Sequence, residues 1–486
     1  MAKASLSAKK RLQNVSDHFD ALATDRGYWI NKAKSFYDED MLFMRELIPS
    51  GLNILEIGSG IGNLLHGLNP SKGIGVDLSK NMVELASQNF SDCKFIHGNI
   101  SDPKTINKLG KNFDAIVISD TLGFLEDIES TLEDLHKLCS PNTRLVVAYY
   151  APMWDPLLKL ASKFGLKMPT KEAALLDEKD ISAMLDSSGY EILRTEKKIL
   201  LPFNLFGVGR IINRFLAPLP LFSFFCIRNY VVARSLQKAK ENLPDSATVI
   251  IPCRNEKGNI FNALERIPRF CKNIEVIFTE GHSTDGTWKE IQKAIKTNKE
   301  LTYGLKIRAI QQSGKGKADA VFSAFNEAAG DVLIILDGDL TVPPEELTKF
   351  WKKISSGKAE YVHGTRLVYP MEKQAMRFLN FIGNRFFSLL FTWLLGQRFT
   401  DTLCGTKVIR KHHYLEAVRR NRMFGDFDPF GDFFLIFGAS RLSLKIVEIP
   451  IRYRARSYGE TQISRFKHGL LLLRMVVFAF FKIKAI

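Results

Sequence analysis

Short apolar runs typical of β-strands alternate with helical patterns in two successive series, and this alternation constrains the fold more than any other feature of the sequence. The first series of strand-like runs comprises residues 53–57, 74–76, 94–96, 115–118 and 145–148, with helical patterns between them such as 80–89 and 128–138. The second series comprises residues 248–252, 275–278 and 332–336. Strands separated by helices favour a parallel sheet with helices on both faces. The sequence therefore predicts an α/β protein with two domains of this kind.

Turn chemistry and composition suggest where these domains end. A chain of 486 residues is enough for two or three domains of roughly 100–200 residues each. We expect a first domain at residues 1–200, an apolar and basic connector at 201–242, and a second domain at 243–460. Pro244, Asp245 and Ser246 give turn chemistry at the second boundary. An amphipathic basic tail is expected at 461–486.

An excess of positive charge, +16 at pH 7, suggests a polyanionic partner such as phosphorylated substrates or an anionic membrane surface. We expect no nucleic acid partner, because no aromatic and basic repeat or known nucleic-acid module occurs. The six cysteines show no CxxC spacing, as is typical of reduced thiols in the cytosol. The N-terminus lacks the apolar core of a signal peptide, and no uncharged apolar stretch reaches the about 20 residues of a membrane span. We therefore expect a cytoplasmic protein peripherally associated with the cytoplasmic face of a membrane.

Three alternating glycines follow the first strand-like run. Gly58, Gly60 and Gly62 come directly after Glu56 and Ile57. Without Cβ atoms, such a turn lets a ligand approach the backbone and the following helix N-terminus closely. The acid Asp77 ends the next run, about 20 residues further on, a spacing that suits a carboxylate accepting hydrogen bonds from ribose hydroxyls.

The order strand, Glu-x-Gly-x-Gly-x-Gly, helix, strand, Asp resembles the class I S-adenosylmethionine-dependent methyltransferases over roughly residues 40–200. The resemblance implies a Rossmann-like, seven-stranded-type sheet. It also implies that Glu56 and the three glycines line the methionine side of S-adenosylmethionine, and that Asp77 holds the ribose. Asn99 stands where the family usually has an Asp facing the adenine; its side-chain oxygen can still accept a hydrogen bond from the amino group.

The residue that performs catalysis in this domain is less constrained. Asp120 ends the fourth strand-like run, beside the expected methyl-transfer point, and is a candidate general base, although an ordinary strand-end carboxylate explains it equally well. Methyl transfer from a sulfonium mainly needs aligned reactants, so the acceptor cannot be deduced from the sequence. Two alternatives stay open: an NAD-type nucleotide fold, and an S-adenosylmethionine-binding scaffold without catalysis.

Two carboxylates follow the most apolar run of the second series. Asp337 and Asp339 are separated by one glycine, and hard carboxylates in such a pair can hold Mg²⁺ or Mn²⁺ against a diphosphate. The metal would offset charge on the departing diphosphate. Lys315 and Lys317, in a glycine-containing segment after an earlier run, are suited to the same phosphates.

These segments resemble the family-2 glycosyltransferases of the GT-A fold over about residues 245–460. The resemblance implies a nucleotide-diphospho-sugar donor and a second Rossmann-like domain. Pro252 and Glu256, with Arg254 between them, match the loop that contacts base and ribose. Asp285 matches the second acid of an Asp-x-Ser-x-Asp element, whose first acid is Glu280 here.

Within that family, the motifs at 339–345, 401–407 and 456–461 resemble those of polyprenyl-phosphate sugar synthases, although Gln462 replaces a usual Lys. A phosphate acceptor is already ionised and needs positioning by cations. Arg366 and Arg456 are the candidate clamps, with solvated surface arginines as the alternative. A hydroxyl acceptor in an inverting mechanism needs a general base, for which Asp432 is the best match. The neighbouring Asp426 and Asp428 stay open as alternatives.

An amphipathic segment at 377–395 favours a lipid or glycan-lipid acceptor. Its polar residues Asn380, Asn384, Ser388 and Thr392 recur every four positions beside a broad apolar face. Such a helix can lie in a bilayer interface, and a buried core helix is the alternative. The basic tail adds attraction to anionic lipid. The sequence thus predicts a bifunctional enzyme, a metal-dependent glycosyltransferase fused to a methyltransferase.

Overall fold

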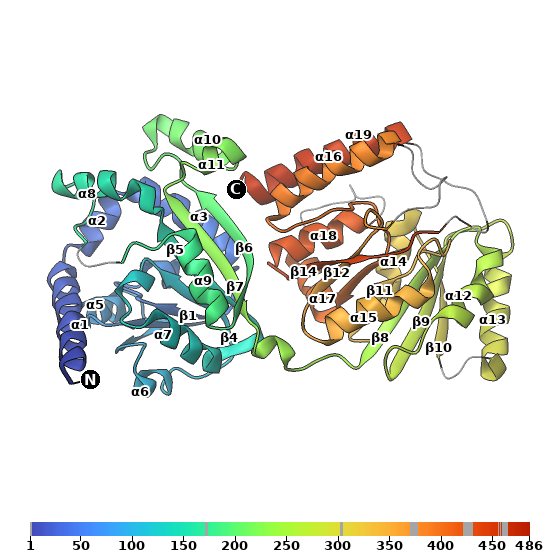
Figure 1. Ribbon diagram of the computed structural model, residues 1–486, viewed down its shortest axis with the longest axis horizontal. Coiled ribbons are helices and arrows are strands. Elements are labelled where there is room, and N and C mark those ends of the chain that lie inside the picture. The colour runs from blue at the N-terminus through green and yellow to red at the C-terminus, as the bar shows by residue number, and fades with distance from the viewer. Residues whose placement is uncertain are drawn as a thin grey trace. The chain divides into compact units, whose positions relative to one another are not determined.

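Two compact units make up the chain, Met1–Glu241 together with Lys484–Ile486, and Asn242–Ile483. Each contains a seven-stranded sheet flanked by helices (Figure 1). The computed structural model describes residues 2–170, 174–301, 305–369, 378–420, 431–454, 456, 458 and 465–486. The predicted α/β fold with two Rossmann-like domains is confirmed.

The sheet of the first unit has the order β3-β2-β1-β4-β5-β7-β6. Its strands are β1 (Asn53–Ile57), β2 (Lys72–Asp77), β3 (Cys93–His97), β4 (Phe113–Ser119), β5 (Cys139–Tyr150), β6 (Tyr190–Lys198) and β7 (Arg228–Ser235). Its helices are α1 (Ala2–Leu22), α2 (Arg26–Lys32), α3 (Lys34–Leu47), α4 (Asn63–Gly67), α5 (Lys80–Asn89), α6 (Pro103–Ile106), α7 (Ile128–Leu135), α8 (Asp155–Lys163), α9 (Glu178–Ser187), α10 (Val208–Phe215) and α11 (Pro220–Ser223). Strands β1 to β5 pair in parallel, whereas β7 runs antiparallel to both β5 and β6.

Alternate residues of each central strand face opposite sides of this sheet, as a period of two requires. Leu55 and Ile57 of β1 join one buried cluster with residues of α7 and α9, while Ile54 joins a second cluster with Phe43 and Met44 of α3. Helices therefore cover both faces, and all the parallel strands end at one edge.

Residues 201–242, which we expected to be a connector, contain the strand β7. Every residue of β7 is buried, and the strand lies between β5 and β6 in the sheet. Its sequence is a short apolar run between arginines, Arg228 and Arg234, whose side chains are nevertheless among the most buried in the chain. The arginines near both ends of this central strand reduce the apolar character by which such a strand is usually predicted from sequence.

The sheet of the second unit has the order β10-β9-β8-β11-β13-β12-β14. Its strands are β8 (Ser246–Cys253), β9 (Asn273–Glu280), β10 (Lys306–Gln311), β11 (Val332–Ile335), β12 (Tyr361–Thr365), β13 (Lys407–Arg410) and β14 (Ile446–Pro450). Its helices are α12 (Ile260–Arg266), α13 (Thr287–Leu301), α14 (Gly316–Glu327), α15 (Leu347–Ser355), α16 (Phe378–Leu395), α17 (Lys411–Arg420), α18 (Asp432–Arg441) and α19 (Arg465–Ala479). Only β13 runs antiparallel to its neighbours, so residues just before β13 lie at the edge where the parallel strands end.

Helix α16 divides its side chains between the core and the surface. Ser388 and Thr392, from the predicted polar stripe, donate to the carbonyl oxygen of Phe399 at 2.9 and 3.1 Å. Leu394 is fully buried, whereas Leu389 is 66% exposed. The buried-core alternative thus holds for one face of this helix, whereas its place in a bilayer interface stays a prediction, and the side chains of residues 378–382 lie outside the described part. Among the described residues, no helix combines the length and apolarity needed to cross a membrane.

A buried ion cluster stabilises the antiparallel end of the first unit. The Glu196 carboxylate pairs with Arg194 at 2.8 Å and with Lys484 at 2.6 Å, and Lys198 Nζ donates to the carbonyl oxygen of Lys484. Burial alone would raise the pKa of Glu196, but the charges of Lys484, Arg194 and Lys198 lower it to about 2. Burial lowers the pKa of Lys198 to about 8.

We expect Glu196→Gln to lower the free energy of unfolding of the first unit by roughly 3–5 kcal/mol, because it leaves buried cations without their anion. Hydrogen exchange of the β6 and β7 amides in the full chain measures this loss. The control is Glu84→Gln, which removes an exposed pair with Lys80 and should change the opening free energy by no more than about 0.5 kcal/mol. Equal effects of the two substitutions would contradict the interpretation.

Candidate functional site

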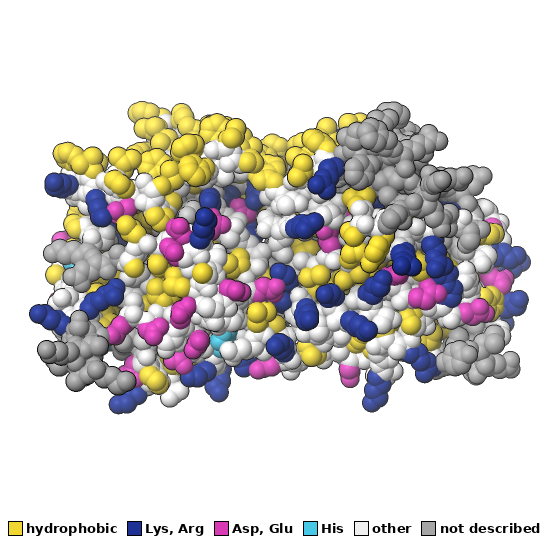
Figure 2. Space-filling view, viewed as in Figure 1, with side chains coloured by type: hydrophobic (Ala, Val, Ile, Leu, Met, Phe, Trp, Pro, Cys, Tyr) yellow, Lys and Arg dark blue, Asp and Glu magenta, His cyan; other side chains and the backbone are white. Residues whose placement is uncertain are grey.

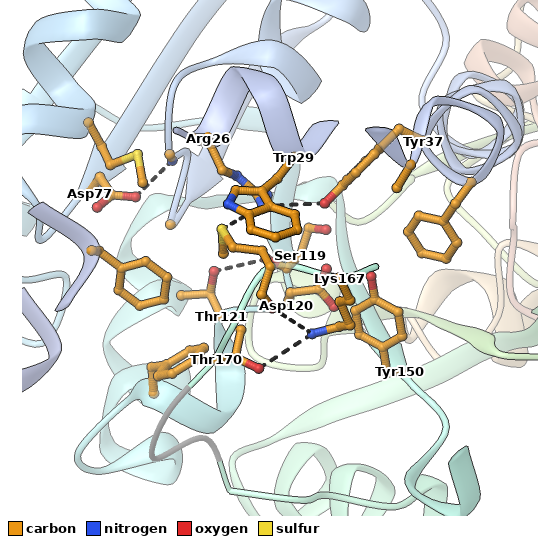
Figure 3. A pocket seen from close by; sticks show the side chains of 18 of the residues that line it. Arg26, Trp29, Tyr37, Asp77, Ser119, Asp120, Thr121, Tyr150, Lys167 and Thr170 are labelled. Carbon is orange, nitrogen blue, oxygen red and sulfur yellow. Dashed lines mark hydrogen bonds between the residues drawn. The ribbon is translucent and has the colours of Figure 1, made fainter. Parts of the chain in front are cut away.

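A cavity of about 600 Å³ opens at the carboxyl edge of the first sheet (Figure 3). Gly58 and Gly60 follow β1, Asp77 ends β2, Asn99 follows β3 and Asp120 follows β4, and all five line the cavity. Its size is in the range of small-molecule sites. A second cavity of about 450 Å³ shares several lining residues with the first and is also lined by Glu56.

The glycine loop is held in place by Asp77. The backbone N–H of Gly60 donates to Asp77 Oδ2 at 2.7 Å, and that of Ser79 donates to Oδ1 at 2.9 Å. Burial raises the pKa of Asp77, although these two hydrogen bonds oppose the rise. Gly58 has a φ of 73°, and a Cβ atom there would lie 2.0 Å from Oγ1 of Thr121. Each carboxylate oxygen of Asp77 retains a further lone pair for a ligand.

Three further predicted residues, Glu56, Gly62 and Asn99, have different surroundings. Glu56 is buried, its pKa is raised well above the ordinary value by burial, and its Oε2 has no hydrogen-bond partner among the described residues. Gly62 lines neither cavity, and a Cβ atom there would lie 2.6 Å from the ring of Phe95, so this glycine serves packing. Asn99 Oδ1, the predicted acceptor for adenine, accepts the backbone N–H of Ser101 at 3.0 Å.

Asp120 is paired with a buried arginine. Arg228, at the start of β7, donates Nη1 to Asp120, Nη2 to Ser119 Oγ at 2.8 Å, and Nε to Asp40 Oδ1 at 3.0 Å. Asp120 has a φ of 54°, a left-handed backbone conformation, and its side chain lines the cavity. Asp120 thus lies at the cavity in an ion pair with Arg228, and its role as a general base stays a prediction.

Sequence reasoning missed several residues that surround this cavity. Arg26 and Trp29 of α2, Tyr150 at the end of β5 and Lys167 after α8 all point toward it (Figure 3). Lys167 Nζ lies 5.4 Å from the ring centre of Tyr150, and burial lowers the pKa of Lys167. These residues come from segments without a motif, and Arg228 lay in the expected connector, so only their hydrophobic or basic character could have indicated them.

At the carboxyl edge of the second sheet, acids from several segments lie beside cations. The Asp337 carboxylate, after β11, pairs with Lys317 of α14 at 2.7 Å, and that of Asp339 pairs with Arg456 at 2.7 Å. Asp432, the first residue of α18, pairs with the buried Lys407 at 3.0 Å. Burial alone would raise the pKa of Asp337, but the charge of Lys317 does most to lower it. Among the described residues, no three His, Cys, Asp or Glu side chains are grouped to hold a metal ion.

Glycines allow this close arrangement. A Cβ atom at Gly405 would lie 1.8 Å from Asp337 Oδ2, and one at Gly338 would lie 2.7 Å from the carbonyl oxygen of Pro252. The motif 401–407 therefore contacts the acid pair directly, with Gly405 against Asp337 and Lys407 beside Asp432.

The loops after β8 and β9 form one connected surface beside the acid pair. Asn255 Oδ1 accepts the backbone N–H of Thr284 at 2.9 Å, and Asp285 accepts the N–H of Lys257 at 3.1 Å. Glu256 lies between Asn259, which donates to it at 2.7 Å, and Arg456 at 3.6 Å. Burial raises the pKa of Glu256 to about 7.

The remaining predicted donor-binding residues lie around this surface. Glu280 is buried at the end of β9 and accepts the backbone N–H of Ser283. Pro252 is half-buried in β8, and Arg254 is exposed after it. Lys315 is exposed and precedes the first residue of α14.

The two predicted acceptor clamps differ in their environment. Arg366 donates twice to Asp401, from Nε at 2.7 Å and from Nη2 at 2.8 Å, and Asp401 is fully buried. Burial alone would raise the pKa of Asp401, but Arg366 lowers it to about 2. This bidentate pair is a structural anchor, which argues against Arg366 as a phosphate clamp. Arg456 instead bridges Asp339 and Glu256 within the acid cluster. Asp426 and Asp428 lie outside the described residues.

Both sites have the arrangement of α/β enzymes that bind nucleotide-like ligands at the carboxyl ends of parallel strands. Residues 248–421 match the family model of glycosyl transferase family 2, and residues 29–195 match that of a methyltransferase domain. The chain therefore carries a family-2 glycosyltransferase domain and a methyltransferase domain, and both predicted resemblances are confirmed.

Curated relatives match the glycosyltransferase part. An undecaprenyl-phosphate 4-deoxy-4-formamido-L-arabinose transferase of Proteus mirabilis is 26% identical over 46% of this chain and 64% of its own length. A dolichol-phosphate mannosyltransferase of Pyrococcus furiosus is 28% identical over 45% of this chain and 59% of its own length. The match thus spans less than two thirds of either relative.

A solved structure resembles the other part. It is a methyltransferase of Thermotoga maritima, described as a possible histamine N-methyltransferase, with 16% identity and a TM-score of 0.35 over 45% of this chain and 98% of its own. A TM-score at this level supports no conclusion about function.

We expect Asp401→Asn to lower the free energy of unfolding of the second unit by roughly 3–5 kcal/mol, because Arg366 would be left buried without its counterion. Folding lowers the pKa of Asp401, so its contribution is present above the ordinary pKa near 4 and is lost as pH falls through about 2. Urea unfolding at neutral pH measures the effect.

The matched control is Glu345→Gln, which removes a bidentate pair with Arg266 whose carboxylate side chain is 55% exposed. An exposed pair contributes little, about 0–1 kcal/mol. If the Asp401 variant is no less stable than this control, the Arg366 pair is not an anchor.

Proposed function

We propose that the second unit is an inverting glycosyltransferase that uses a nucleotide-diphospho-sugar donor, a bound Mg²⁺ or Mn²⁺, and a polyprenyl-phosphate or related glycolipid or polysaccharide acceptor. We further propose that the first unit transfers a methyl group from S-adenosylmethionine. One observation carries the first proposal. The Asp337 and Asp339 carboxylates lie at the carboxyl edge of the sheet, beside the surface formed by Glu256 and Asp285.

The acid pair fits a divalent cation by its donor chemistry, because hard carboxylate oxygens are the preferred ligands of Mg²⁺ and Mn²⁺. Asp339 gives Oδ1 to the N–H and hydroxyl of Thr341 and Oδ2 to Arg456. Lys317 and Arg456 thus place positive charge directly beside the two carboxylates that would hold the metal ion. A bound metal would supply charge to offset the departing diphosphate. Lys317 and Arg456 would then be released toward the donor phosphates.

The cations around Asp432 favour a phosphate acceptor over a hydroxyl. Lys407 lies 3.0 Å and Lys317 3.9 Å from Asp432 Oδ1, so two cations lie close together where they could position an ionised phosphate. An ionised phosphate acceptor needs no general base. The names of the two relatives, an undecaprenyl-phosphate and a dolichol-phosphate transferase, support the same class of acceptor.

The methyltransferase proposal is supported by the two adjoining cavities. Asp77, which lines the first cavity, would accept hydrogen bonds from the ribose of S-adenosylmethionine, and Oε2 of buried Glu56, without a partner among the described residues, would accept one from its ammonium group. The residues present therefore fit the cofactor, which supplies an electrophilic methyl group. Arg228 holds Asp120, so this chain's contribution is alignment of the reactants. A non-catalytic S-adenosylmethionine-binding scaffold is the alternative.

Peripheral attachment to the cytoplasmic face of a membrane would bring a lipid-linked acceptor to the second unit. Helices α16 and α19 pack on each other, and both keep apolar side chains exposed, with Leu389 at 66% and Leu470 at 56%. Basic residues such as Arg474 and Lys482 would add attraction to anionic lipid.

We expect Asp339→Asn to lower metal-dependent sugar transfer by at least about 100-fold, since one charged ligand position is lost. The measurement is transfer from a panel of nucleotide sugars to a polyprenyl phosphate, with Mn²⁺ titrated against a chelator. The control is Asp331→Asn, at the opposite end of the same strand, where the exposed carboxylate of Asp331 accepts the hydroxyl of Ser246 at 2.7 Å. Transfer that needs no metal, or an Asp339 variant as active as the control, would refute the site.

We expect Asp77→Asn to weaken S-adenosylmethionine binding by roughly 10- to 100-fold, because hydrogen bonds to a charged group contribute about 1.5–3 kcal/mol. Calorimetric titration measures binding, and release of a labelled methyl group measures turnover. Asp92→Asn, a half-exposed acid that pairs with His66, is the control. Equal affinity of the two variants would argue against the assigned ribose contact, and binding without any turnover would favour the scaffold.

A further inference from the structure

The methyltransferase unit carries a large apolar surface outside its cavity. It consists of exposed side chains of α8 and the loop after it, residues 157–166, and of the segment 203–225 that contains α10 and α11. Phe164 is 72%, Leu221 82% and Phe206 fully exposed, and Ile211 and Phe224 are each about three fifths exposed. Figure 2 shows hydrophobic side chains gathered over α8, α10 and α11. Contiguous exposed apolar surfaces of this extent mark interaction sites.

The two segments form one surface. Trp154, just before α8, donates its indole N–H to the carbonyl oxygen of Phe225 at 3.1 Å. Leu158 and Leu166 of the first segment and Phe203 of the second line the same cavity. We call the exposed apolar side chains of 157–166 and 203–225 the apolar surface of the first unit.

Charge indicates what covers this surface. Residues 156–170 and 199–227 contain no Asp or Glu, and they contribute Lys159, Lys163, Arg210 and Arg214, all exposed. Asp155, the first residue of α8, is the exception and pairs with Lys159 at 2.7 Å. A helix with apolar side chains on one face and mainly cations beside them is suited to an anionic bilayer interface, where apolar groups insert and cations meet lipid headgroups. A protein partner of ordinary composition would need no such excess of cations over acids.

The cavity of the methyltransferase site adjoins this surface. Leu166 is 57% exposed on the surface, whereas the next residue, Lys167, turns its amine inward to Thr170 Oγ1 at 3.4 Å (Figure 3). Arg26 lines the same cavity. A molecule with an apolar chain and a polar, anionic head would therefore meet apolar side chains outside and two cations inside.

We propose that the apolar surface of the first unit inserts into an anionic lipid bilayer, and that the methyl acceptor is a membrane amphiphile whose head enters the cavity from that surface. The second half rests on the proposed methyltransferase function. The first half, insertion into a bilayer, does not rest on that function. It is also separate from the attachment proposed for α16 and α19. Each half has its own measurement.

Insertion is tested with a nitroxide label on the full chain. Labels are placed at Phe206→Cys and at Leu415→Cys, an exposed position on α17 in the other unit, after Cys93 and Cys271 are replaced by Ser. With vesicles of phosphatidylcholine and phosphatidylglycerol, the label at 206 should gain oxygen accessibility and lose accessibility to a water-soluble relaxant, while the label at 415 does not change. No change at 206 would overturn insertion.

Mutation of the surface provides a second measurement. Phe206→Glu combined with Leu221→Glu should lower vesicle affinity by at least about tenfold, because two apolar side chains no longer insert. Leu415→Glu is the control. Both replaced side chains are exposed, so the fold should be retained. If the double variant instead dissociates a wild-type dimer in ultracentrifugation and binds vesicles normally, the surface joins two copies of this chain and the proposal is wrong.

The acceptor is tested with labelled S-adenosylmethionine and a total membrane lipid extract. We expect the labelled methyl group in the organic phase, and a several-fold decrease for the double variant with unchanged affinity for S-adenosylmethionine. Label only in water-soluble products, or none despite binding, would overturn the amphiphile acceptor. Failure to bind S-adenosylmethionine at all would refute the proposed methyltransferase function, while the insertion measurement would still decide the first half.

Discussion

Charge compensation at the carboxyl edge of the second sheet is the interaction on which its site depends. Parallel strands bring their carboxyl ends to one edge, where the half-buried Asp337 and Asp339 lie near the buried Asp432. Such a set of anions repels itself and loses its hydration. Lys317, Lys407 and Arg456 supply the balancing charge within ion-pair distance.

This compensation also determines how the site can respond to ligands. The cations that balance Asp337 and Asp339 come from other segments of the chain than the acids. Lys317 belongs to α14 and Arg456 follows β14, whereas the two acids follow β11. A metal ion that replaced them would leave two cationic groups beside the diphosphate. The fixed pair of Arg366 and Asp401 does not take part in such an exchange, because Asp401 is fully enclosed. If a metal ion binds as proposed, the site would combine an exchangeable set of ion pairs with a permanent one.

Much of the fold could be predicted from sequence because apolar runs and glycines determine strands and turns through neighbouring residues in the chain. Strand β1 and helix α5 have the predicted bounds, and the loop of Gly58 and Gly60 lies where its motif requires. β7 escaped prediction because buried arginines interrupt its apolar pattern, and an Arg is tolerated there only through partners distant in the sequence, such as Asp40 and Asp120. Long-range ion pairs leave no local signal, and the same reason hid the pairing of Arg366 with Asp401.

The buried arginine of β7 links the missed strand to the chemistry of the first site. Arg228 binds Asp40 of α3, Ser119 at the end of β4 and Asp120 beyond it, so one guanidinium fixes the wall of the cavity. A wall fixed in this way can orient an acceptor. Methyl transfer from a sulfonium depends mainly on such alignment of the reactants. If the acceptor enters from the apolar surface as proposed, this fixed wall would select it by shape and polarity.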